Sequence, residues 1–116
     1  MARVWLIHWH EQEVAERRRA LEDAGHQVMV HWRQGSRPER PDPLPDVMVV
    51  SLDRLPSHGR AIAEWLWEAK SRRHIPIVFA GGSPDKVAAT RKRFPDATFC
   101  TTADMVATVA TASGGA

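Results

Sequence analysis

The sequence predicts an α/β domain in which helices cover both faces of a parallel sheet. Four apolar runs indicate strands, and a weaker fifth follows them: Val4–Ile7, Gln27–Trp32, Val47–Leu52, Ile75–Ala80 and Ala97–Thr101. Helical segments lie between most of these runs, and such alternation is typical of a parallel sheet with helices on both faces. A chain of 116 residues is the size of one domain, so we expect one unit over 1–112 and a frayed tail over 113–116.

The first third of the chain predicts a strand, a helix and a second strand. The first apolar run suits a strand that is covered on both faces. Helical character follows over Glu11–Ala24, and Gly25 supplies the left-handed residue that commonly ends a helix. We expect Val14, Arg18 and Leu21 on the inner face of this helix. The second run alternates between polar and apolar residues and indicates an edge strand.

The segment Gly35–Pro45 contains four prolines and no helical period. A helix is not expected there, because an internal proline removes a hydrogen-bond donor and clashes with the preceding turn. We therefore expect a Pro-rich, partly extended crossover in place of a second helix, leading into the strand Val47–Leu52.

The clearest helical pattern in the chain covers Gly59–Lys70. Ile62 and Leu66 form its inner stripe, and Trp67 is expected to point away from that stripe. The strand Ile75–Ala80 follows this helix.

The signals for a further helix follow the fourth strand. Ser83–Asp85 combines a capping serine, a proline in the first turn and an acidic residue near the positive end, so a helix is expected from there to Phe94. Pro95 ends it, and a short last helix is expected over Ala103–Thr111. Gly81–Asp85 resembles a phosphate cradle in outline, but a tight turn with a helix cap explains the same residues.

Several stretches, taken in order, resemble a bacterial response-regulator receiver domain. Arg19–Val28 is similar to the first helix and second strand of that family, and Pro45–Val50 to the approach to its phosphorylation site. Gly59 and the helix after it, and then His74–Val78, resemble its third helix and fourth strand. The resemblance implies a flavodoxin-like fold with a five-stranded parallel sheet of order 2-1-3-4-5, and a place in two-component signal transduction.

The residues at the expected receiver pocket depart from the family's pattern. The phosphoryl acceptor position is Ser51, and the acid pair that holds Mg²⁺ falls on His8 and Trp9. The switch position after the fourth strand is Gly81, and the lysine position after the fifth is Thr102. Since Mg²⁺ prefers oxygen ligands in near-octahedral geometry, the resemblance implies a degenerate pseudo-receiver with no cofactor and no enzymatic activity.

Asp53 lies two residues beyond Ser51 and has two interpretations. It is a displaced phosphoryl acceptor in an atypical receiver, or it is a loop aspartate that bonds local amides.

The main hypothesis is a non-catalytic signalling or scaffold module that binds another protein, or a second copy of itself, without aspartyl phosphorylation. Receivers that this chain resembles meet their partners through the fourth helix, fifth strand and fifth helix. The candidate contact residues are Trp67, Arg91, Phe94 and Phe99, of which Phe99 also suits a core strand.

A second hypothesis is a small-ligand or transition-metal sensor that uses the histidines at the strand ends. His8 and His10 are two residues apart, and with His58 or Asp53 they supply nitrogen and oxygen ligands. No short metal-binding motif is present, and histidines that form local hydrogen bonds explain the same pattern.

Composition excludes some classes of function. The net charge of +2 is too small to indicate nucleic-acid binding, and no apolar stretch approaches the length of a membrane span. The arginine clusters 17–19, 72–73 and 91–93 are expected to be solvated helix faces. One cysteine, Cys100, fits a reducing compartment, so we expect a cytoplasmic protein that binds neither nucleic acid nor a membrane.

Overall fold

The computed structural model describes residues 2–8, 11–31, 44–53 and 56–112. Its five strands form one parallel sheet of order β2-β1-β3-β4-β5, so the predicted fold and strand order are confirmed. The strands are β1 (Arg3–Ile7), β2 (Gln27–His31), β3 (Val47–Ser51), β4 (Ile77–Ala80) and β5 (Thr98–Cys100). The helices are α1 (Glu11–Asp23), α2 (Pro56–Glu68), α3 (Pro84–Arg93) and α4 (Met105–Ala112), with a short 3₁₀ turn, η1 (Lys70–Arg72).

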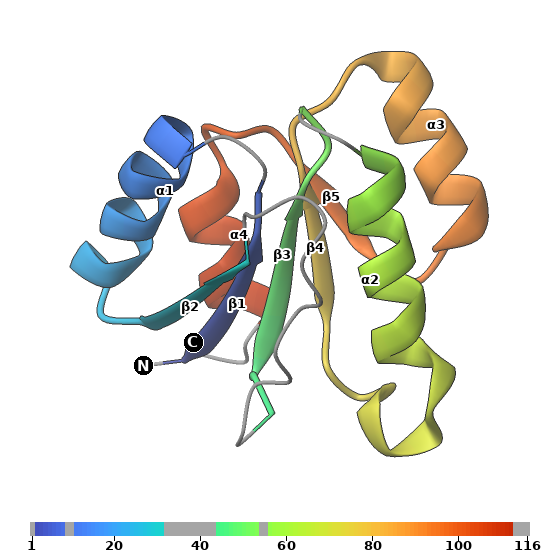
Figure 1. Ribbon diagram of the computed structural model, residues 1–116, viewed down its shortest axis with the longest axis horizontal. Helices are drawn as coiled ribbons and strands as arrows, with labels where there is room; N and C mark the ends of the chain where they lie inside the picture. The colour runs from blue at the N-terminus through green and yellow to red at the C-terminus, as the bar shows by residue number, and fades with distance from the viewer. Residues whose placement is uncertain (1, 9–10, 32–43, 54–55, 113–116) are drawn as a thin grey trace.

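Helices lie on both sides of the sheet: α1 and α4 on one, α2 and α3 on the other (Figure 1). Alternate residues of the central strands supply the two apolar layers, because successive side chains of a strand point to opposite faces. Val4 and Leu6 of β1 pack on the α1 and α4 side, whereas Trp5 and Ile7 pack on the α2 side. Residues 4–7 of β1 and all five residues of β3 are buried because helices cover both faces of the sheet.

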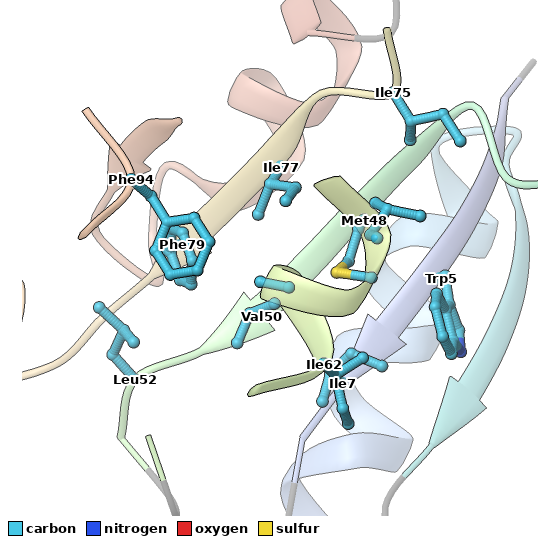
Figure 2. Packing of buried hydrophobic residues seen from close by; sticks show 12 residues of the cluster. Trp5, Ile7, Met48, Val50, Leu52, Ile62, Ile75, Ile77, Phe79 and Phe94 are labelled. Atoms are coloured by element: carbon cyan, nitrogen blue, oxygen red, sulfur yellow. The ribbon is translucent and has the colours of Figure 1, made fainter. Parts of the chain in front are cut away.

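The layer under α2 and α3 combines aliphatic side chains with the aromatic rings of Trp5, Phe79 and Phe94 (Figure 2). Phe79 of β4 is fully buried, and its ring centroid lies 5.2 Å from that of Phe99 and 5.3 Å from that of Phe94. On the same side, Trp5 meets Trp65 edge to face at 6.1 Å. Offset and edge-to-face pairs of this kind stabilise a core beyond the area that they bury.

The structure corrects the expected orientation of α1. Arg18 was expected on the inner face with Val14 and Leu21, but its side chain is 51% exposed and pairs with Glu22. Arg17 instead turns inward, with only 11% of its side chain exposed. Both arginines are compatible with the helical spacing of the buried apolar positions, so the packing of α1 on the sheet decides between them.

Three of the four expected contact residues, Trp67, Phe94 and Phe99, pack in or against the apolar layer. Phe94 is 4% exposed because the chain turns at the end of α3 and places its ring against Phe79, so its assignment to the contact surface was wrong. Trp67 does not simply point away from the core. Its ring centroid lies 6.0 Å from that of Phe94, and its Nε1 donates to the Ile75 carbonyl at 2.8 Å, which leaves the side chain half-buried.

The helix boundaries differ slightly from those expected. α2 begins at Pro56 rather than Gly59, in agreement with the tolerance of proline in a first helical turn. α3 has the expected cap, since the Ser83 hydroxyl accepts from the Lys86 N–H. Most of the Pro-rich crossover and the tail 113–116 lie outside the described residues.

No helix within the described ranges is long and apolar enough to cross a membrane.

Candidate functional site

The candidate site lies at the carboxyl ends of the central strands, where ligands collect in open α/β sheets. His8 follows β1, Ser51 ends β3, Gly81 and Gly82 follow β4, and Thr102 follows β5. All of these except Gly82 were predicted in the pocket, as was Asp53, whose carboxylate accepts from Gly82 and Thr102. Trp9 lies outside the described residues.

The centre of the site is occupied by the guanidinium of Arg17, a residue of the arginine cluster 17–19 that was expected to be solvated. Its Nη1 lies 2.8 Å from His8 Nδ1 and donates to Ser51 Oγ at 3.0 Å. Its Nη2 donates to Asp53 Oδ2 at 3.2 Å. Helix α1 therefore delivers a fixed positive charge to the pocket, because an arginine side chain stays protonated in proteins.

Arg17 determines the tautomer of His8. A guanidinium can only donate, so His8 Nδ1 must accept and the ring proton must sit on Nε2. That atom lies 3.3 Å from Glu13 Oε1, one turn before Arg17 on α1. Burial and the Arg17 charge together lower the pKa of His8 to about 4, so the fully buried ring is neutral at pH 7.

Asp53 joins three other segments of the chain. In addition to the Arg17 contact, the Gly82 N–H donates to Asp53 Oδ1 at 2.8 Å, and the Thr102 hydroxyl donates to Asp53 Oδ2 at 3.4 Å. Partial burial would raise the pKa of Asp53, but the Gly82, Arg17 and Thr102 contacts outweigh it and hold that pKa below its ordinary value. Asp53 is thus held as an ionised carboxylate that accepts from an amide distant in sequence, that of Gly82.

The loop after β4 allows the carboxylate to approach so closely. Gly81 and Gly82 both have positive φ, at 76° and 90°. A Cβ at Gly81 would lie 2.4 Å from Asp53 Oδ2, so a side chain there would exclude the carboxylate from its place. The absence of a side chain at the family's switch position thus makes room for Asp53.

We predict that Gly81→Ala disrupts the contacts of Asp53, whereas Gly25→Ala does not. Both changes place a Cβ on a backbone of positive φ, which costs about 1–2 kcal/mol. Gly25 has open space around it, but the new methyl group at Gly81 collides with the carboxylate. Urea denaturation should therefore show a loss for Gly81→Ala that exceeds the Gly25→Ala loss by at least about 1 kcal/mol. Equal losses would contradict this assignment.

The stability of the folded protein is expected to depend on the protonation of His8. Because the folded-state pKa of His8 lies below its ordinary 6.5, the unfolded chain binds the extra proton more readily. His8 therefore contributes stability that is present above pH 6.5 and is lost as the pH falls towards about 4, by up to about 3 kcal/mol.

The variant His8→Asn tests whether His8 causes this pH dependence of stability, since the asparagine amide oxygen can accept from Arg17 but does not titrate. Denaturation curves between pH 6.5 and 4.5 should show a shallower loss of stability in the variant. Parallel losses in both proteins would show that His8 is not the titrating group.

The histidine-based metal hypothesis finds no support in the described residues. No group of three or more His, Cys, Asp or Glu side chains there is arranged to hold a metal ion. The Nδ1 lone pair of His8 already accepts from Arg17. His10 lies outside the described residues, as does the side chain of His58.

Cys100 is half-buried at the end of β5. Burial raises the pKa of its thiol above the ordinary value, as for an unreactive cysteine.

Comparison of the sequence with models of protein families and with curated proteins gave no match. Solved structures with the same fold do exist. The signal receiver domain of a signal transduction histidine kinase from Syntrophus aciditrophicus is 16% identical, with a TM-score of 0.65 over 98% of this chain and 88% of that one. The bacteriophytochrome response regulator RtBRR is 15% identical, with a TM-score of 0.70 over 99% of this chain and 77% of that one.

A third similar structure is the Mn²⁺-bound form of the response regulator Rcp1. It is 15% identical, with a TM-score of 0.65 over 94% of this chain and 89% of that one. Identities this low establish the fold and leave the chemistry to the residues of the site. This chain has the fold of a response-regulator receiver domain, with Arg17 and Asp53 paired at its strand ends.

Proposed function

We propose that this domain is a signalling or scaffold module that binds another protein and does not depend on aspartyl phosphorylation. The observation that supports the proposal is the position of Arg17. Its guanidinium contacts His8, Ser51 and Asp53 at the strand ends, where a receiver would hold its metal ion and acceptor carboxylate.

The residues present do not suit a divalent cation. Mg²⁺ requires several oxygen ligands at close range. Phosphoryl transfer to an aspartate relies on this ion to neutralise the charge of the phosphoryl group. Here the nearly buried guanidinium of Arg17 lies beside Asp53, and its positive charge would repel a metal ion. The response regulator Rcp1, which has the same fold, has been solved with Mn²⁺ bound, and we propose that the Arg17 guanidinium disfavours such an ion here.

Ser51 is also poorly placed to accept a phosphoryl group. Its Oγ is almost fully buried and accepts from both the Arg17 guanidinium and the Asp53 N–H. His8 cannot serve as its base, because His8 Nδ1 is held by Arg17. These contacts favour a binding role over catalysis for the domain.

The contact face that we propose consists of α3, β5 and α4. Arg91 is exposed on α3, and its guanidinium carbon lies 4.8 Å from the ring centroid of the half-buried Phe99. Arginine stacked on an aromatic ring combines apolar area with charge, and such residues are enriched at interface centres. The basic end of α3, Arg91–Arg93, favours a partner with an acidic surface.

Trp67 lies at a different surface feature, an open groove of about 520 Å³ between α2 and the end of α3. Glu64 and Arg93 form an ion pair across this groove. We propose Trp67 as a secondary contact, since its buried edge packs on Phe94 while part of the side chain still reaches the groove.

Phosphoryl transfer gives the direct test. The protein is incubated with acetyl phosphate and Mg²⁺, and its intact mass is measured. We expect no phosphoryl adduct, and no change of the backbone amide spectrum on addition of Mg²⁺ alone. A stable adduct on Asp53 would contradict the proposal and establish an atypical receiver.

The contact face is tested by self-association. If the partner is a second copy of the chain, sedimentation at rising protein concentration will reveal a dimer that Arg91→Glu weakens. Arg19→Glu, an equal charge change at an exposed position of α1, serves as the matched control. A monomer at all concentrations, or a dimer that both variants weaken equally, would rule out self-association through this face.

A further inference from the structure

The Asp53 carboxylate lies among hydrogen-bond donors that come from three distant parts of the chain. Arg17 is contributed by α1, Gly82 by the loop between β4 and α3, and Thr102 by the loop between β5 and α4. A fixed cation, a backbone N–H and a hydroxyl are together the donor set by which proteins recognise an oxyanion. We refer to Arg17, Gly82 and Thr102 as the donor cradle.

Contacts other than those with Asp53 hold much of the donor cradle in place. His8 and Ser51 orient the Arg17 guanidinium, which is nearly buried. The loop that carries Gly82 is anchored by the Gly81 N–H, which donates to the Cys100 carbonyl at 3.0 Å. The donors are therefore arranged in advance for an anion, and this lowers the entropy cost of binding one.

We propose that the donor cradle is a carboxylate-binding site whose resident ligand is the protein's own Asp53. This inference rests on the proposed function, since an unphosphorylated Asp53 is needed to occupy the site. The occupied cradle links the loops that lead into α3 and α4, the two helices of the proposed contact face. Asp53 is thus a positioning residue that holds this face in one conformation without a phosphoryl group.

The loop after β4 comes close to the carboxylate, since a Cβ built on Gly81 would lie 2.4 to 2.9 Å from the carboxylate atoms of Asp53. We therefore expect the cradle to accept a planar carboxylate more readily than the bulkier tetrahedral phosphate. The side chain is nevertheless 37% exposed, so a small ion can reach the site from solvent. Formate has the size of the group that Asp53→Ala removes, and it is the probe that fits the vacated space.

Chemical rescue tests the proposal. Asp53→Ala is expected to lower the thermal midpoint in chloride, and sodium formate at equal ionic strength is expected to restore part of the loss. Formate at about ten times its dissociation constant raises the ratio of folded to unfolded protein about tenfold. The Gly82 amide resonance should move with the same formate dependence. Phosphate should rescue at least tenfold more weakly than formate.

Three controls make the test specific. The wild type should not respond to formate, because the tethered carboxylate competes at a far higher effective concentration. Asp53→Asn should not be rescued, because its amide still fills the cradle. Asp46→Ala also removes a carboxylate that accepts a backbone N–H, from Arg3 at the other end of the sheet, and should not respond either.

Equal effects of formate and chloride on Asp53→Ala would overturn the proposal, as would a rescue that survives Arg17→Met in the same chain. If Asp53→Ala does not fold in chloride, Asp53→Ser replaces it under the same criteria. The outcome is separable from that of the phosphorylation test. A phosphoryl adduct on the wild type with formate rescue of Asp53→Ala would refute the proposed function alone, whereas no adduct and no rescue would refute the cradle alone.

Discussion

Replacement of Arg17 by methionine is expected to lower the free energy of unfolding by about 2–4 kcal/mol. The change leaves the His8 Nδ1 and the Ser51 Oγ without the donor that they share in a buried site. It also leaves the Asp53 carboxylate without its cation. The thermal midpoint should fall by roughly 10 °C, which differential scanning calorimetry or a urea denaturation curve can measure.

Arg18→Met is the matched control for this prediction, because it removes an arginine from the next position of the same helix. Arg18 and Glu22 form a pair whose side chains are about half exposed, at 51% and 48%. Exposed pairs of this spacing contribute only about 0.5 kcal/mol or less. If the two variants lose similar stability, the Arg17 contacts do not hold the site together.

Phe79→Ala is expected to have the largest effect of any substitution considered, about 3–5 kcal/mol. The Phe79 ring is fully buried and lies between those of Phe94 and Phe99, so its removal leaves a cavity lined by rings that cannot close over it. Since small domains are stable by only about 5–15 kcal/mol, the variant should be near its unfolding threshold at 37 °C. The measurement is the urea midpoint at 25 °C.

Phe99→Ala provides the comparison, since it removes the same number of atoms from a half-buried position at the sheet edge. Its cost should be about half that of Phe79→Ala, because solvent can enter the space that it vacates. A Phe99→Ala loss as large as the Phe79→Ala loss would show that the edge of the sheet, and not its centre, limits stability.

Much of the fold could be predicted because local patterns and the tertiary structure agree. The apolar runs in β1 and β3 indicated strands that are covered on both faces. The alternation of strands and helices indicated a parallel sheet. Ser83 and Pro84 marked the start of α3 correctly. The strand order came from the resemblance to receivers, since periodicity alone does not specify which strands are neighbours.

The candidate site could be predicted only in part. The ends of the strands are local features, and His8, Ser51, Gly81 and Thr102 were placed there correctly. Phe94 was misplaced because a residue at a helix end can fold inward or outward, and its neighbour Phe79 decides this through packing.

The sequence by itself determined a parallel α/β domain with His8, Ser51, Gly81 and Thr102 at the ends of its strands. It did so because burial patterns and turn signals are properties of residue types. Only the tertiary structure decided that Arg17, out of three consecutive arginines, enters the pocket and meets Asp53. That choice depends on how α1 packs on the sheet, and one residue along a helix changes the direction of a side chain by about 100°. The hydrogen bond between Asp53 and Gly82 likewise joins residues 29 positions apart. It depends on the positive φ of Gly82, which local sequence patterns do not specify.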